Sequence, residues 1–200
     1  MFMNTSFKEL NPAKSKSFLK KLETNSIPHH FKEKSKFLMQ DLSFSDEWVR
    51  IDAEDYSETP FIKKSFFLKE NVIKPFQFTD HPLNDNLKDI SPKICEKTVI
   101  DYLLLYCHLW IQNGEVIKPA LNFEDIPWQD DVSPMIKKSL DQDFGAYPKI
   151  SKNNNALMVT IICLFKQSLM TVTFDVEENG GVTVTDRVVL IEDLPIKHLP

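Results

Sequence analysis

Cysteine and histidine are the side chains in this sequence with the widest chemical range, and Cys107 and His108 are adjacent. They lie in a stretch with the pattern of a helix, where neighbouring side chains point about 100° apart, so no thiol–imidazole dyad is predicted. His108 shares a polar stripe with Asp101, about 10 Å away along the helix axis. If the stripe lined a cleft, Asp101, Tyr102 or His108 could act as an acid or base. A solvated stripe on an otherwise buried helix is favoured, and catalytic residues stay unassigned.

The spacing of the histidines predicts no metal site. No two have the HxxxH or HExxH spacing of zinc ligands, and there is no CxxC motif. His29 and His30 could each supply one ligand, but an exposed loop after Pro28 is the simpler interpretation. The five histidines are His29, His30, His81, His108 and His198.

Scarce glycine argues against phosphate-binding loops. The chain has four glycines and contains neither GxxxxGK[ST] nor GxGxxG. We therefore predict no nucleotide and no other cofactor. Acidic clusters lack the ligand spacing of an EF-hand and are interpreted as solvated loop charge or as partners for the lysine-rich arm. These clusters are Asp52-Glu54-Asp55, Glu124-Asp125 and Asp130-Asp131.

One long helix is predicted over residues 92–113. Ser91 is placed to cap it, Pro92 to occupy its first position and Gly114 to end it. Apart from the polar stripe, its circumference is mainly apolar, which indicates burial on most sides.

The last fifty residues carry the clearest strand pattern. Ala156–Phe165 is almost wholly apolar, Leu169–Val176 alternates, and Val182–Ile191 follows the turn Asn179-Gly180-Gly181. This predicts a three-stranded antiparallel meander, with a bulge near Asp186-Arg187.

Two further strands are predicted over Phe61–Leu68 and Val72–Phe78, with Pro75 favouring a sheet edge. Ser133 and Pro134 start a shorter predicted helix that Gly145 ends.

Residues 1–45 are predicted to form a lysine-rich helical arm, followed by a single α+β domain over residues 46–200. Asn11 and Pro12 start a helix, and Phe31–Leu42 has loosely helical spacing. The first forty residues carry a net charge of +5. Such an arm could bind nucleic acid or anionic lipid, but the whole chain has a pI near 5.6 and only two arginines, which argues against nucleic acid.

The predicted fold class is α+β: an antiparallel sheet with a C-terminal three-stranded meander packed against the 92–113 helix. A small-ligand pocket between helix and sheet is one hypothesis. Its lining would be Tyr102, Tyr106, Trp110, Phe165 and Phe174.

The leading hypothesis for function is a non-enzymatic interaction module that self-associates, as a homodimer for example, or binds a protein partner, because sheet edges invite pairing. The alternative is a small-ligand-binding protein or divergent enzyme that uses the pocket. Three scattered cysteines predict reduced thiols in a cytoplasmic compartment, and no apolar run is long enough for a transmembrane segment.

The stretch Val99–Cys107, together with the three C-terminal strands and Glu192–Pro195, resembles a group of uncharacterised bacterial proteins of unknown function. The resemblance covers roughly residues 60–195 and implies no activity. In shape alone, a helix against a curved antiparallel sheet is similar to cystatin-like and nuclear-transport-factor-like folds.

Overall fold

The computed structural model describes residues 7–57, 59–111, 116–129, 132–153 and 155–197. These residues form two antiparallel sheets and the helices between and outside them, so the protein is α+β. The first sheet has the order β1 (Lys8–Glu9), β2 (Lys36–Asp41), β3 (Val49–Asp55), β4 (Ile62–Lys69) and β5 (Val72–Pro75). The second has the order β10 (Val182–Ile191), β9 (Ser168–Glu177), β8 (Ala156–Phe165) and β6 (Lys118–Pro119), and β7 (Lys149–Asn153) also pairs with β8. The helices are α1 (Pro12–Thr24), α2 (Val99–Leu109) and α3 (Pro134–Gly145), with short turns η1 (Leu83–Leu87) and η2 (Phe123–Asp125).

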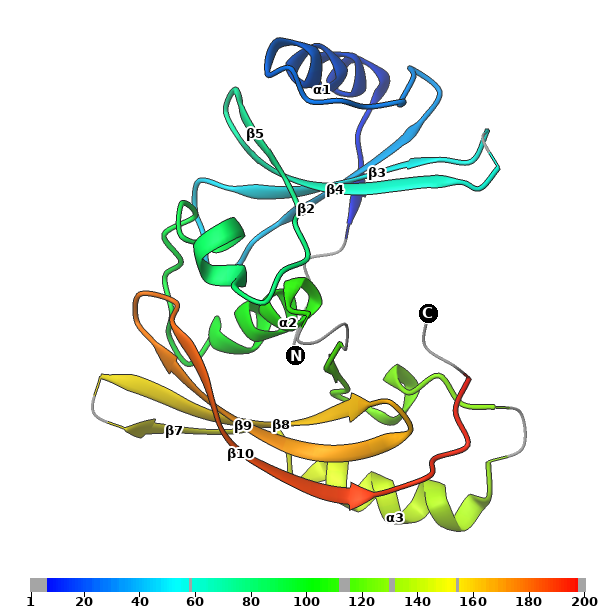
Figure 1. Ribbon diagram of the computed structural model, residues 1–200, viewed down its shortest axis with the longest axis vertical. Helices are drawn as coiled ribbons and strands as arrows, with labels where there is room; N and C mark the ends of the chain where they lie inside the picture. The colour runs from blue at the N-terminus through cyan, green and yellow to red at the C-terminus, as the bar shows by residue number, and fades with distance from the viewer. Residues whose placement is uncertain (1–6, 58, 112–115, 130–131, 154, 198–200) are drawn as a thin grey trace.

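The elements are stacked in five layers (Figure 1). α1 covers the outer face of the first sheet, α2 lies between the two sheets, and α3 covers part of the outer face of the second. Each pair of neighbouring layers encloses apolar side chains, and the largest cluster surrounds α2. The fold therefore has its main core between the sheets, with a smaller core on each outer side.

α1 begins where the sequence predicts. The side chain of Asn11 accepts a hydrogen bond from the backbone N–H of Lys14 at 2.9 Å, and Pro12 occupies the first turn. Phe18 and Leu22 are buried against the first sheet. The opposite side of α1 faces solvent.

α2 begins later than the predicted helix of residues 92–113. Ser91, the predicted cap, has a left-handed φ of +47° and does not start a helix. The following residues form a turn in which the hydroxyl of Thr98 accepts a hydrogen bond from the backbone N–H of Cys95 at 3.0 Å. This local side-chain bond competes with regular helix and delays its start.

α2 also ends earlier than predicted, because its next residue pairs with a distant segment. Trp110 is extended and forms a β-bridge with Thr79. The backbone N–H of Thr79 donates to the carbonyl of Leu109 at 3.0 Å, and the N–H of Ile111 donates to Thr79 at 2.9 Å. Gly114, the predicted end, lies outside the described residues. Eight of the eleven α2 residues are buried, so the helix is shorter than predicted but enclosed.

The helical prediction for residues 31–42 is wrong. These residues contain β2, in which Phe37 lies opposite Ala53 and Met39 opposite Ile51. Phe37, Ala53 and Ile51 are buried beneath α1. Cross-strand pairing and a shared core have overridden the loose helical spacing.

The predicted boundary after residue 45 does not match the strand pairing. β2 lies before that boundary and β3 after it, yet every residue of β2 pairs with one of β3. α1 packs on the same sheet. Described residues 7–45 are therefore part of the layered fold rather than a separate arm.

The second sheet contains the C-terminal meander β8–β9–β10. Gly180 in the β9–β10 turn has a left-handed φ of +89°. Its carbonyl accepts a hydrogen bond from the hydroxyl of Tyr102 at 2.6 Å. A Cβ at Gly180 would lie 2.8 Å from that hydroxyl and 2.7 Å from Pro92 Cγ, so glycine is required both by backbone conformation and by space.

We predict that Gly180→Ala lowers the free energy of unfolding by about 2 kcal/mol or more, because it adds both strain and a clash. Tyr102→Phe should lower it by about 1–2 kcal/mol, because a buried carbonyl loses its partner. Urea unfolding followed by fluorescence measures both. Gly145→Ala is the control, since a Cβ added at Gly145 would meet no other side chain or backbone atom within 4 Å. Equal stability of the Gly180 and Gly145 variants would contradict this account.

Candidate functional site

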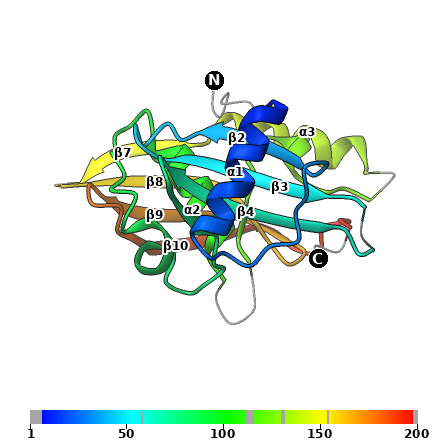
Figure 2. The same ribbon diagram turned by 90° about the horizontal axis from the view of Figure 1, so that it is seen from above.

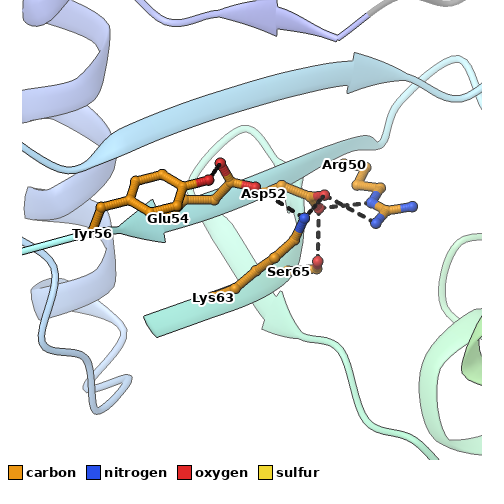
Figure 3. Close-up of polar contacts among 6 residues, drawn as sticks. All are labelled: Arg50, Asp52, Glu54, Tyr56, Lys63 and Ser65. Atoms are coloured by element: carbon orange, nitrogen blue, oxygen red, sulfur yellow. Dashed lines mark hydrogen bonds and ion pairs between the residues drawn. The ribbon is translucent and has the colours of Figure 1, made fainter. Parts of the chain in front are cut away.

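A row of charged side chains lies on β3, on the face of the first sheet that looks toward α2. Arg50, Asp52 and Glu54 alternate with Ile51 and Ala53, which face α1. Strand alternation therefore puts all three charges on one side (Figure 3). On β4, Ser65 lies opposite Asp52 and Lys63 lies opposite Glu54, and both complete the row.

Asp52 is the centre of this network. Arg50 donates to its carboxylate through Nε at 2.8 Å and through Nη2 at 3.1 Å. Ser65 Oγ donates to Oδ1 at 2.7 Å, and Lys63 Nζ lies 3.9 Å from Oδ2. A buried carboxylate needs hydrogen-bond partners to offset its loss of hydration, and Asp52 has them.

Glu54 connects the network to the surface. It forms an ion pair with Lys63 at 2.9 Å and accepts a hydrogen bond from the Tyr56 hydroxyl at 2.8 Å. The bond from Lys63, followed by that from Tyr56, lowers the pKa of Glu54 despite its burial. The ring of Tyr56 is exposed and stacks on Phe61, with centroids 5.7 Å apart. The network thus holds an aromatic pair in a fixed position at the surface.

Arg50 is also in contact with aromatic rings. Its guanidinium carbon lies 5.4 Å from the centroid of Phe7 and 5.2 Å from that of Phe76. Both carboxylates of the row are already bonded to cations. The row is therefore better suited to fixing the sheet and the aromatic pair than to accepting a substrate proton.

Asp55 follows the row and is buried on the other side. Its carboxylate accepts hydrogen bonds from Ser35 Oγ at 2.6 Å and from the backbone N–H and hydroxyl of Ser57 at 2.8 and 2.6 Å. These bonds, the one from Ser35 first, lower the pKa of Asp55 to about 2. The carboxylate stabilises the end of β3 while it is charged.

The prediction that the acidic residues of this strand are solvated loop charge is wrong, and the ion pairs described above for Asp52 and Glu54 are with Arg50 and Lys63 rather than with lysines of the predicted arm. Asp52, Glu54 and Asp55 lie on β3 and are buried. The alternation of Arg50, Asp52 and Glu54 with apolar neighbours is the signal that could have placed them on a strand. Glu124 and Asp125 form a capped turn instead, while residues 130 and 131 lie outside the described residues.

The three residues considered as acid or base do not converge. Asp101 accepts a hydrogen bond from Ser43 at 2.6 Å beside a cavity of about 50 Å³, and Tyr102 is bonded to Gly180. His108 contacts the ring of Phe78, with centroids 5.6 Å apart. Desolvation, followed by the charge of Arg50, lowers the pKa of His108, which Asp52 partly opposes. A cavity of that size has room for water rather than for a metabolite.

The predicted pocket residues lie in the main core. Tyr102, Tyr106, Trp110 and Phe174 are buried in one apolar cluster, and Phe165 packs against it half-buried. Burial raises the pKa of Tyr106 to about 12. These side chains fill the space between α2 and the second sheet where the pocket was predicted.

An open hollow of about 620 Å³ lies near the start of α2, and Cys95 and Lys97 contribute to its lining. The exposed thiol of Cys95 has a lowered pKa, chiefly through its hydrogen bond with Thr98. Lys152, across the hollow, pairs with Glu96 at 3.5 Å. No histidine is among the described lining residues, so a thiol–imidazole pair is not formed there.

The free edge of β10 is the longest exposed strand edge of the second sheet. β10 pairs with β9 on one side, and no described strand pairs with its other side. Val188 and Val189 point to opposite faces and are 50% and 49% exposed. Register shifts next to Thr185 and Leu190 mark two irregular positions, the first close to the predicted bulge.

Within the described part of the chain, no three histidine, cysteine or acidic side chains come together as metal ligands. His29 and His30 lie after α1, and His198 lies outside the described residues. None of the described helices is both long enough and apolar enough to cross a bilayer.

Comparison with protein-family models, with curated proteins and with solved structures finds no match for this chain.

We predict strong energetic coupling between Arg50 and Asp52. Arg50→Met and Asp52→Leu should each lower the free energy of unfolding by about 2–4 kcal/mol, because each leaves a buried charge without its main partner. The double variant should cost at least about 1 kcal/mol less than the sum. The exposed pair Lys93–Asp46 is the control, and its cycle should give coupling of about 0.5 kcal/mol or less. Additive costs at Arg50 and Asp52 would refute the network.

A pH dependence follows from Asp55. Because its folded pKa of about 2 lies below the ordinary value of 3.8, its stabilisation is present above about pH 4 and is lost as the pH falls toward 2. Asp55→Asn should therefore destabilise the protein most at neutral pH, and its difference from the parent should shrink between pH 5 and pH 2. Urea unfolding at several pH values measures this. Asp41→Asn, at an exposed position of β2, is the control. A difference that stays constant with pH would contradict the role of the charge.

Proposed function

We propose that the protein is an interaction module that binds an extended segment of another protein along the free edge of β10. The observation that carries this proposal is a ten-residue edge strand whose outer side has no described partner. Such an edge carries unpaired backbone N–H and C=O groups, which an added strand can satisfy.

The side chains of β10 favour strand addition. Val188 faces the outer side of the second sheet with Thr171, and Val189 faces α2's side with Met170. Both are half exposed, so an added strand would bury apolar surface on both faces of the sheet. Backbone bonds would supply affinity, and the two valines would supply contacts for alternate partner side chains.

The charges of β10 disfavour two registers of self-pairing and favour a partner segment of complementary charge. If the β10 strands of two copies paired antiparallel in one continuous sheet, a two-fold axis would relate them. One residue of β10 would then lie directly opposite the same residue of the other copy. Pairing centred on Asp186 or Arg187 would place like charges opposite each other, which is destabilising. A segment with a basic residue opposite Asp186 and an acidic residue opposite Arg187 would instead match both.

The alternative function, a small-ligand-binding protein or enzyme with a pocket between α2 and the second sheet, has less support. Tyr102 and Phe174 are fully buried and leave the expected space filled. We also propose a reducing, cytoplasm-like compartment, which is supported by the unpaired thiols of Cys107 and Cys163 in the core.

The test is selection of binding peptides from a random library displayed on phage against the purified full-length chain. We predict enriched peptides with alternating β-branched residues and a neighbouring pair of opposite charges. Val188→Lys/Val189→Lys should weaken their binding about tenfold or more, because edge lysines oppose strand addition.

Val72→Lys is the matched control, since Val72 lies on the edge strand β5 of the other sheet and is 48% exposed. It should leave peptide binding unchanged. Peptides that ignore the β10 substitutions would overturn the proposal. Analytical ultracentrifugation of the parent and the same variants shows whether a second copy occupies the edge. If the parent is a dimer and Val188→Lys/Val189→Lys is a monomer, the edge binds a second copy rather than a different protein.

A further inference from the structure

The outermost layer on the side of the first sheet is a basic face formed by α1 and the segment that follows it, residues 12–35 (Figures 1 and 2). Seen from above, α1 lies across the sheet with its axis along the surface (Figure 2). Its apolar side, with Phe18 and Leu22, is buried, so its lysine-bearing side is what a partner would meet.

This basic face has a charge opposite in sign to that of the whole chain. Residues 12–35 contain six lysines and two glutamates, a net charge of +4, whereas the chain carries −5. Lys16 forms an exposed ion pair with Glu33 at 3.5 Å. Lys14 and Lys20 are exposed and have no ion pair with the described acidic residues. Their charges are available to a partner.

The rest of the molecule has the opposite sign. Residues 94–200 carry a net charge of −6, and the second sheet and α3, which they form, lie on the far side of α2 (Figure 1). Charges separated by more than about 10 Å are screened at physiological salt. A partner at the basic face therefore meets the local positive charge, and the acidic side would turn away from an anionic surface.

We propose that this basic face adsorbs to the surface of an anionic phospholipid bilayer. The four lysines of α1 outnumber its one acidic residue, the exposed Glu23. The other exposed positions of the helix are Pro12, Ala13, Ser17 and Thr24, so it can approach a flat surface closely. None of these is a large apolar residue, so binding is electrostatic and does not involve insertion. Each lysine near an anionic leaflet strengthens binding by about fivefold.

The same residues favour lipid over nucleic acid. The basic face contains no arginine, and the chain's two arginines lie on β3 and β10. Its phenylalanines Phe18 and Phe31 are buried, so the exposed imidazole of His30 is the main ring that it offers for base stacking. A lysine ammonium group is a compact point charge that makes no planar, bidentate contacts. It therefore suits charged lipid headgroups, which have no fixed geometry.

The experiment is co-sedimentation of the purified full-length chain with phosphatidylcholine vesicles, with and without phosphatidylserine. We expect binding only when phosphatidylserine is present, and at least about tenfold weaker binding after a rise from about 0.05 to 0.5 M salt. Lys14→Glu/Lys20→Glu should weaken binding by about tenfold or more.

Lys149→Glu/Lys152→Glu on β7 is the matched control, because it changes the net charge equally at exposed positions of the second sheet. It should retain binding, and urea unfolding confirms that both variants fold. The proposal is overturned by failure to bind phosphatidylserine vesicles, by equal losses in the two variants, or by tighter binding to a mixed-sequence DNA duplex than to vesicles. None of these outcomes bears on the β10 edge, so the two proposals are tested separately.

Discussion

The burial of α2 between two sheets is the constraint on which the other features of the molecule depend. Its side chains pack against Phe44 and Phe67 from the first sheet's side and against Val172 and Phe174 from the second. A polar group enclosed in such a layer must find a partner, so the Tyr102 hydroxyl bonds to the β9–β10 turn. That bond fixes the turn from which β10 starts. The position of the free edge is thus set from within the core.

The local signals predicted well those elements that are specified by short-range chemistry. The caps at Asn11 and Ser133 and the turn at Gly180 are each made by one or two residues, and all three are present. The C-terminal end of α2 depends on a distant group, since Trp110 leaves the helix to pair with Thr79. The strand identity of β2 likewise depends on pairing with β3. Spacing along the chain does not contain that information.

The charged row on β3 was missed for a related reason. Charge in a sequence predicts exposure, because an unpaired buried carboxylate is costly. Asp52 and Glu54 are buried because β4 brings Ser65 and Lys63 opposite them, and this pairing exists only in the folded sheet. A buried ion network of this kind adds little net stability over apolar residues. The network instead specifies the register of β4 against β3. A one-residue slip of β4 would move Ser65 away from Asp52 and Lys63 away from Glu54.

The edge strands β5 and β10 differ in length and in sequence, and this difference bears on the proposed function. β5 is four residues long and ends in Pro75, which offers no N–H to a further strand. β10 is ten residues long and contains no proline, but it carries Asp186, Arg187 and two irregular positions. Charges and bulges on an edge oppose indiscriminate pairing without removing its backbone groups. Under the proposed function, a bound strand would have to match both charges and the interrupted register. The β5 edge is short and lacks one N–H at Pro75, whereas the β10 edge keeps all its backbone groups.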